Sequence, residues 1–263
     1  MDSTLLKGLT MLEALAKSPA PRGIADLSRE LELTKSNVHR TLQTLVSAGY
    51  VRPAETAGTY ECTLKLFELA SSVMGRVDVR SVAEPHMHAL AAATEETVHL
   101  AALDGIEVIY LHKIESPQPV RAYSTIGGRA PAHCVATGKA LLAYQADETL
   151  AALPKRLSTH TERTLGDRDA LLDELTTVRR QRYAMNRGEW RESVCGLAAI
   201  VLDATGSPTA AIGISGPADR LRPATLKRHS TIVLDTARTL SEQLGCVDYE
   251  EATGRFGGKK IPS

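Results

Sequence analysis

Residues 33–48 read Leu-Thr-Lys-Ser-Asn-Val-His-Arg-Thr-Leu-Gln-Thr-Leu-Val-Ser-Ala. Val38, Leu42 and Leu45 follow one another at steps of four and three residues, so they fall on one stripe of a helix. Thr34 is a suitable N-cap residue, and the glycine after residue 48 is a suitable C-terminal cap. The stretch therefore predicts an amphipathic helix whose apolar stripe packs on the rest of the N-terminal part of the chain.

The outer face of this helix is rich in hydrogen-bond donors. Asn37 and Arg40 suit base edges, because Asn can bind adenine and Arg can bind guanine through two hydrogen bonds each. Lys35 and Ser36 suit phosphates, which position a helix without reading sequence. Taken alone, the pattern also fits an ordinary solvated helix. Together with the neighbouring segments, it predicts DNA contacts by Arg22, Lys35, Ser36, Asn37, Arg40, Thr41 and Gln43.

The segments on either side complete a winged helix-turn-helix pattern. The spacing of apolar residues and the turn residues predict helices over residues 4–18, 23–31, 33–48, 64–74 and 79–94, and wing strands over 50–52 and 59–63. In the wing, Arg52 either contacts DNA or only pairs with Glu55. Gly75–Asp78 is the candidate linker between this domain and the rest of the chain.

After Glu96 the apolar pattern becomes typical of strands. We expect strands over residues 97–103, 107–113, 120–126, 195–202 and 210–215, and helices over 136–145, 147–153, 167–180 and 221–244. The predicted fold class is α+β, with an N-terminal all-α winged helix-turn-helix domain and a C-terminal domain built on an antiparallel sheet.

Composition limits the classes of protein that fit. The 263 residues carry no formal net charge, so any DNA-binding surface must be local; residues 22–52 hold five basic and three acidic side chains. The four cysteines are far apart and have no metal-binding spacing, which predicts neither a disulfide framework nor a metal site. We expect a cytoplasmic protein without signal peptide, membrane span or cofactor.

Five motifs occur in an ordered series, at residues 33–42, 96–100, 127–134, 136–142 and 214–217. The series resembles the IclR (isocitrate lyase regulator) family of bacterial transcription factors over both parts of the chain. The resemblance implies a winged helix-turn-helix domain over residues 1–75, a linker helix over 76–94 used in dimerisation, and a GAF-like effector-binding domain over 95–250. In the helix-turn-helix turn, Glu32 stands where the family usually has glycine, at a cost of roughly 1 kcal/mol in a left-handed conformation.

The start of the 136–145 helix is a candidate anion site. Small residues there leave backbone N–H groups open, and the helix dipole favours a negative charge, so a small carboxylate is the expected effector. Alternatively, Thr137 only caps its helix and Gly138 only allows close packing. Through the resemblance, we expect effector contacts by Ala122, Ala136, Thr137, Gly138, Asn186, Gly196 and Ser215.

The function predicted from these residues is a ligand-responsive transcriptional regulator, most simply a repressor of a catabolic operon. It would bind a palindromic operator as a homodimer or a dimer of dimers. Two alternatives are an enzyme with an attached DNA-binding domain and a DNA-binding protein with an inactive sensor. His133 and Cys134 are adjacent, but neighbours on a strand point to opposite faces, so we expect a structural role and not a nucleophile.

Overall fold

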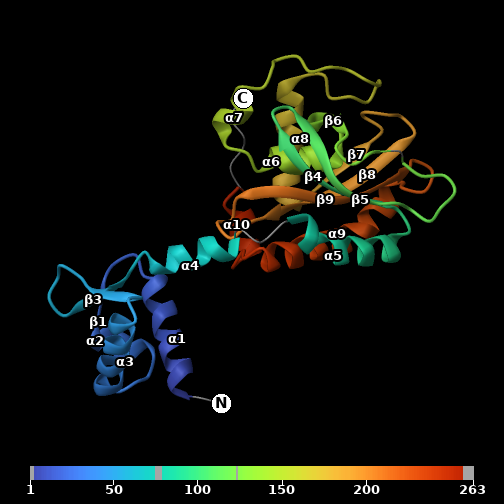
Figure 1. Cartoon of the computed structure of the whole chain (residues 1–263). Coiled ribbons are helices and arrows are strands. Elements are labelled where there is room, and N and C mark those ends of the chain that lie inside the picture. The colour runs from blue at the N-terminus through green and yellow to red at the C-terminus, as the bar shows by residue number, and fades with distance from the viewer. Residues whose placement is uncertain (1–2, 75–78, 123, 257–263) are drawn as a thin grey trace. The chain divides into compact units, whose positions relative to one another are not determined.

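The computed structural model describes residues 3–74, 79–122 and 124–256 (Figure 1). The chain divides into two compact units, 1–76 and 77–263. The candidate linker Gly75–Asp78 lies outside the described residues. No helix in the described part of the chain is long and apolar enough to cross a membrane.

The N-terminal unit is a small helical domain with a wing. Its elements are α1 (Ser3–Ala16), β1 (Arg22–Gly23), α2 (Ile24–Glu30), α3 (Lys35–Ser47), β2 (Val51–Pro53), β3 (Thr59–Cys62) and α4 (Lys65–Met74). The expected wing is present, and a strand that sequence did not reveal, β1, extends it to an antiparallel sheet of order β1-β3-β2. Met11, Leu27, Val38, Leu42 and Val51 form the buried core, which confirms the apolar stripe of the 33–48 helix.

Hydrogen bonds at the turn between α2 and α3 set where the second helix begins. Glu32 adopts a φ of 53°, the left-handed conformation that its place in the turn predicted. The Ser28 hydroxyl donates to the Leu33 carbonyl at 2.6 Å, and the Leu33 N–H donates to the Ser28 carbonyl. Thr34 caps α3 by accepting a hydrogen bond from the Asn37 N–H. The turn is thus closed by side chains as well as by the backbone.

The C-terminal unit is built on a six-stranded antiparallel sheet of order β6-β5-β4-β9-β8-β7. The strands are β4 (Thr97–Asp104), β5 (Glu107–Ile114), β6 (Arg129–Pro131), β7 (Tyr183–Arg187), β8 (Val194–Leu202) and β9 (Pro208–Pro217). The helical segments are α5 (Val79–Thr94), the 3-10 turn η1 (Ala132–Cys134), α6 (Ala136–Ala143), α7 (Asp147–Ala151), α8 (Arg168–Gln181), α9 (Pro223–Gln243) and α10 (Tyr249–Gly254).

The sheet is covered by helices on both faces (Figure 1). Leu197, Ala199 and Val201 of β8 pack with α5 and α9 on one face. Ala198 and Ile200 of the same strand pack with α6 and α8 on the other face. Both sets are buried because successive residues of a strand point to opposite sides. The expected α+β antiparallel architecture is confirmed.

Three expectations from the sequence were wrong or incomplete. The described residues of 120–126 form a loop and not a strand: Val120 and Ile126 are 66% and 53% exposed, so their alternation does not reflect a buried face. The chain instead turns at Gly127, with φ 77°, whose N–H donates to the Tyr110 carbonyl. Strand β7 and helix α10 were not anticipated.

Helix α5 falls within the linker helix that we expected to serve dimerisation over 76–94. Ala83, Met87 and Leu90 are buried against the sheet and α9. Its apolar stripe is therefore used within the C-terminal unit, where it forms a layer over the sheet.

Candidate functional site

Helix α3 presents the polar face that its sequence predicted. Lys35, Ser36, Arg40 and Gln43 are exposed, whereas Asn37 is half-buried. Thr41 is also half-buried. The Arg40 guanidinium donates to the Asn37 side-chain oxygen at 3.1 Å, so the two proposed base readers already lie side by side. The donors on this face suit the phosphates and base edges of a DNA groove in their chemistry.

The two arginines beside α3 are engaged in ion pairs. Arg22 on β1 pairs with Glu30 at 2.5 Å, so it must leave this partner before it can bind a phosphate. Arg52 pairs with Glu61 across the wing and not with Glu55, because Arg52 and Glu61 are directly opposite in the β2–β3 register. The suggested Glu55 partner was therefore wrong.

The far end of α3 is held by a lysine from α4. The Lys65 ammonium donates to the Ala48 carbonyl at 2.8 Å and lies 4.7 Å from the Tyr50 ring centroid. A cation at a helix C-terminus is favourable because the last carbonyls carry partial negative charge. Lys65 thus holds α3 in place at the end away from its polar first turns.

In the C-terminal unit, residues distant in sequence converge on one cavity. Its lining comprises His99, Tyr110, Ala122, Ser124, Val135, Ala136, Thr137, Asn186, Trp190, Arg191, Val194, Gly196, Gly213, Ile214 and Ser215. The strand register accounts for part of this convergence: Asn186 is opposite Gly196, which is opposite Ser215. Six of the seven residues expected to contact an effector line the cavity, and Gly138 does not.

Gly138 packs against η1 and does not line the cavity, for a steric reason. A Cβ atom at this position would lie within 2.6 Å of the Ala132 backbone, so glycine is needed for η1 and α6 to pack. For Gly138 the close-packing alternative is therefore correct. Thr137, by contrast, does line the cavity, and no side chain caps α6, so the alternative role of Thr137 as a cap is not realised.

The side chain of Asn186 makes three hydrogen bonds within the protein. Its oxygen accepts hydrogen bonds from the Gly188 and Glu189 N–H groups, both at 3.0 Å, and its nitrogen donates to the Val194 carbonyl. Asn186 therefore holds the β7–β8 loop in shape. Asn186 nevertheless lines the cavity, and a hydrogen bond to an effector would have to come from the second N–H of its side chain, because the oxygen is already used.

His99 is the polar centre of the cavity and was missed by sequence reasoning. Its ring nitrogens lie 2.6 Å from the Ser124 hydroxyl and 3.3 Å from the Ser215 hydroxyl. Burial, with a smaller contribution from Lys113, lowers the pKa of His99 to about 3, so the ring is neutral near pH 7. The available signal was one histidine in an otherwise apolar run of β4.

Arg191 is the cationic side chain of the cavity lining and was also missed. Its guanidinium lies 4.9 Å from the Trp190 ring centroid, and no ion pair of the described residues involves it. Burial raises the pKa of Tyr110 to about 12 against the opposing effect of Arg191, so the phenol stays neutral. The cavity thus combines neutral hydroxyls and imidazole with one positive charge.

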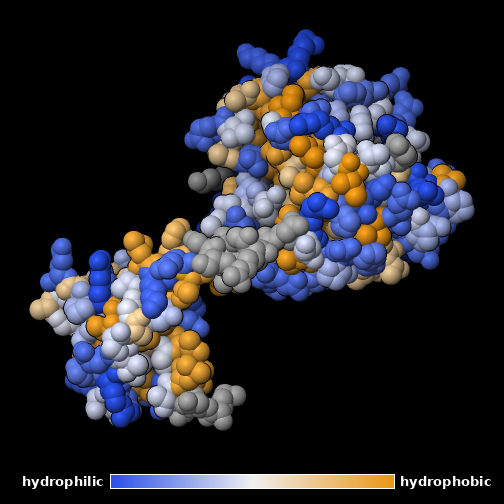
Figure 2. Space-filling model, in the orientation of Figure 1, coloured by the Kyte–Doolittle hydropathy of each residue, from blue (hydrophilic) through white to orange (hydrophobic). Residues whose placement is uncertain are grey.

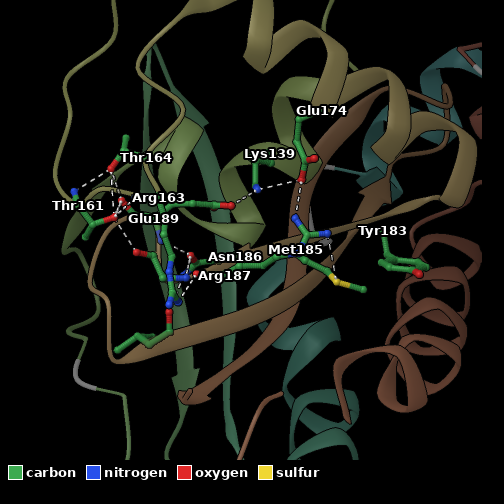
Figure 3. A network of polar contacts seen from close by, with 12 residues as sticks. Lys139, Thr161, Arg163, Thr164, Glu174, Tyr183, Met185, Asn186, Arg187 and Glu189 are labelled. Carbon is green, nitrogen blue, oxygen red and sulfur yellow. Dashed lines mark hydrogen bonds and ion pairs between the residues drawn. The ribbon is translucent and has the colours of Figure 1, made fainter. Parts of the chain in front are cut away.

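A buried ionic network joins α6, α8 and the β7–β8 loop (Figure 3). The Lys139 ammonium is fully buried and binds Glu189 at 2.9 Å and Glu174 at 3.1 Å. Burial raises the pKa of Glu189 more than Lys139 lowers it. For Glu174 burial acts in the same direction, but Lys139 and Arg187 outweigh it and the pKa is lowered. Glu174 is less buried, which explains the opposite directions.

His133 and Cys134 lie in the 3-10 turn η1 and not on a strand. The opposite-face argument used for them therefore does not apply. Burial, followed by the charge of Glu189, raises the pKa of the Cys134 thiol to about 12. A thiol with such a pKa is protonated at neutral pH, which still argues against a nucleophilic cysteine.

Two protein-family models match the chain. A model of the bacterial transcriptional regulator IclR C-terminal domain matches residues 71–242, and a model of the IclR helix-turn-helix domain matches residues 4–55. The chain belongs to the IclR family. It is a transcriptional regulator with a DNA-binding domain and an effector-binding domain.

Similar proteins cover nearly all of this IclR-family chain. The transcriptional regulator KdgR of Dickeya chrysanthemi is 37% identical over 252 residues, which are 94% of this chain and 81% of that protein. The transcriptional repressor AllR of Escherichia coli K12 is 33% identical over 92% of this chain and 90% of its own. The crystal structure of the Agobacterium tumefaciens repressor BlcR has a TM-score of 0.78 and 26% identity, covering 94% of this chain and 99% of that one.

The pKa of His99 predicts how this IclR-family regulator responds to acid. A folded-state pKa of about 3, below the ordinary 6.5, means that the unfolded chain binds a proton first as the pH falls. The contribution of His99 to the free energy of unfolding is therefore fully present above pH ~6.5. It is lost as the pH falls toward ~3, with a slope that approaches about 1.4 kcal/mol per pH unit. Urea unfolding of the C-terminal unit should show a shallower loss for His99→Gln. His88→Gln, on an exposed position of α5, should follow the unchanged protein; parallel curves for all three proteins would contradict the assignment.

Proposed function

We propose that the chain is a repressor of a catabolic operon, released from DNA when a small carboxylate binds the cavity of its C-terminal unit. It acts in the cytoplasm, where its DNA lies. It binds a palindromic operator as a homodimer or as a dimer of dimers. The repressors AllR and BlcR among its relatives support the direction of control. No reaction is assigned to the cavity.

The observation that carries the ligand class is that Arg191 and the start of α6 line the same cavity. Ala136 and Thr137 line the cavity in the first turn of a helix that no side chain caps, so its partial positive charge faces inward. Arg191 adds a full charge, and arginine suits a carboxylate because it donates two parallel hydrogen bonds. The Ser215 hydroxyl provides a further polar contact, exchanging its present partner His99 for the ligand.

Binding requires the cavity to open. Its free volume is about 40 Å³, whereas an engineered cavity of roughly 150 Å³ is needed to hold one benzene. Trp190 and Arg191 belong to the β7–β8 loop, and Ala122 and Ser124 to the loop before β6. We propose that outward movement of these loops admits the ligand, since the strands and α6, which form the rest of the lining, are tightly packed.

On DNA, we propose that α3 lies in the major groove. Arg40 and Asn37 read bases, while Lys35 and Ser36 contact phosphates. Thr41 and Gln43 complete the contacts along the helix, and Arg22 joins the phosphate contacts once released from Glu30.

Replacing Arg40 by alanine is expected to remove specific binding and leave the fold intact, since the side chain is exposed. The full chain first selects its operator from a random DNA library, and anisotropy titrations then compare the selected and scrambled sequences. Arg40→Ala should lose about 1–3 kcal/mol on the selected sequence only. Lys35→Ala is the matched contrast and should weaken both sequences alike. Equal losses for Arg40→Ala would make Arg40 a phosphate contact.

Replacing Arg191 by glutamine is expected to weaken carboxylates selectively. Calorimetry with a panel of small organic acids and their matching amides identifies the ligands that the unchanged chain binds. Arg191→Gln should lose about 1.5–3 kcal/mol for acids, the usual value of a hydrogen bond to a charged group. The amides should be affected little, and Arg180→Gln, at an exposed position on α8, should behave like the unchanged chain. Amides that bind as well as acids would exclude the carboxylate.

For dimerisation, the N-terminal helix offers an apolar surface. Leu5, Leu6 and Leu9 of α1 are 63%, 53% and 50% exposed, and Figure 2 shows the apolar strip along this helix. Contiguous exposed apolar side chains usually mark an interface. Helix α5, which we also expected to contribute, buries its stripe within its own unit, so we assign the interface to α1.

Charged residues in this strip should separate the dimer. Light scattering of the full chain at micromolar concentration should give a dimer mass, and the double variant Leu6→Asp, Leu9→Asp should give a monomer mass. Lys7→Asp is the control, because it changes charge on another side of the same helix. A monomeric unchanged chain would remove the basis for a palindromic operator.

A further inference from the structure

Three side chains of metal-binding type meet next to η1. One ligand atom from each of His133, Cys134 and His160 lies within 4.8 Å of those of the other two. None of the three lines the ligand cavity. We propose that His133, Cys134 and His160 bind a zinc ion, in a site that is separate from DNA and effector binding.

The ligand set and its spacing fit zinc. Two imidazoles and one thiolate are soft and borderline donors that Zn²⁺ favours, in a tetrahedral arrangement whose fourth position holds water. Bonds of about 2.0–2.3 Å place neighbouring ligand atoms about 3.4–3.6 Å apart in a tetrahedron. The three atoms therefore need to move together by roughly 1 Å, which rotation of the exposed His160 side chain can provide.

The surroundings already orient His133 as a metal ligand. Its Nε2 lies 2.9 Å from the Ser158 carbonyl, which can only accept, so Nε2 carries the proton and Nδ1 carries the lone pair. A backbone carbonyl on the second ring nitrogen is the usual companion of a metal-bound histidine, because it fixes the tautomer and the ring orientation. The imidazole of His133 is thus set for binding before the ion arrives.

The loop that carries His160 is held in place next to the cluster. Thr161 donates from its hydroxyl to the Gly188 carbonyl at 2.8 Å, and Thr164 donates to the Glu189 carbonyl at 2.6 Å. His133 and His160 also line a surface cavity of about 430 Å³, which gives an ion and its water a path to the cluster. The third ligand is thus presented by an anchored segment at an accessible place.

Binding proceeds with a simple proton balance. The Cys134 S–H bond breaks, a sulfur–zinc bond forms, and the proton passes to the solvent; no oxidation or reduction occurs. The Lys139 ammonium nearby is paired with Glu189 and Glu174, and Arg187 also pairs with Glu174, so the cation enters a region whose own charges are balanced. A bound ion would tie η1, which leads into α6, to the loop before α8.

Cobalt serves as a visible probe of this site. The full chain, stripped with a chelator, is titrated with Co²⁺ alone and then with Zn²⁺ in competition. We expect one equivalent of cobalt, with a thiolate-to-cobalt charge-transfer band that zinc removes. Cys134→Ser should lose this band, and His160→Ala should bind zinc at least about 100-fold more weakly, since loss of a direct ligand costs no less than loss of its supporting partner.

Two matched variants and a check of the fold serve as controls. Cys195→Ser removes another buried cysteine of the same unit, and His88→Ala another exposed histidine; both should bind zinc like the unchanged chain. Circular dichroism of the metal-free proteins checks the fold, and His160→Ala should pass because the side chain is exposed. Absence of the band in the unchanged chain, or full zinc affinity in His160→Ala, overturns the proposal. Neither result bears on DNA or effector binding.

Discussion

The buried ammonium of Lys139 is the constraint on which the effector-binding unit depends. A fully buried charge is tolerated only when it is paired, and here two carboxylates from different elements meet it. Glu174 comes from α8 and Glu189 from the β7–β8 loop, so one cation fixes α6, α8 and this loop together. Breaking such a buried pair costs roughly 3–5 kcal/mol, a large fraction of the stability of a domain.

The same cation links the framework to the site. Lys139 lies in α6 two residues after Thr137, which lines the cavity, and Glu189 directly precedes Trp190 and Arg191. Asn186 reinforces the loop by accepting two of its N–H groups. Arg191 therefore lies two residues from a carboxylate that is held in a buried ion pair with α6. This arrangement gives a physical route from the cavity to helix packing.

The N-terminal unit relies on a different kind of constraint, which is local. Thr34, Ser28 and Glu32 close a short turn, and Lys65 caps the far end of α3. All these contacts bind backbone groups at helix ends that would otherwise lack partners. These contacts lie at the ends of α3, whereas on its polar face Arg40 donates a hydrogen bond to Asn37.

Much of the framework was readable from the sequence. The four-residue step from Val38 to Leu42, with Thr34 and Gly49 at the ends, predicted α3, because side chains three or four residues apart share one face of a helix. Apolar runs likewise located β8 and β9. The motifs also pointed to most of the cavity wall, although Gly138 proved to serve packing.

What only the tertiary structure decided is which distant side chains meet. His99 and Arg191 enter the cavity because β4 pairs with β9 and the β7–β8 loop folds over it, and no local pattern encodes strand register across more than a hundred residues. The loop over 120–126 shows the converse: its alternation suited a strand, but the turn at Gly127 and the lack of a surface to cover left Val120 and Ile126 exposed. Likewise, His133 and Cys134, which lie in the 3-10 turn η1, come close to His160, which is more than twenty residues away in the sequence. Periodicity reports which face of an element is apolar, whereas convergence depends on how the elements pack.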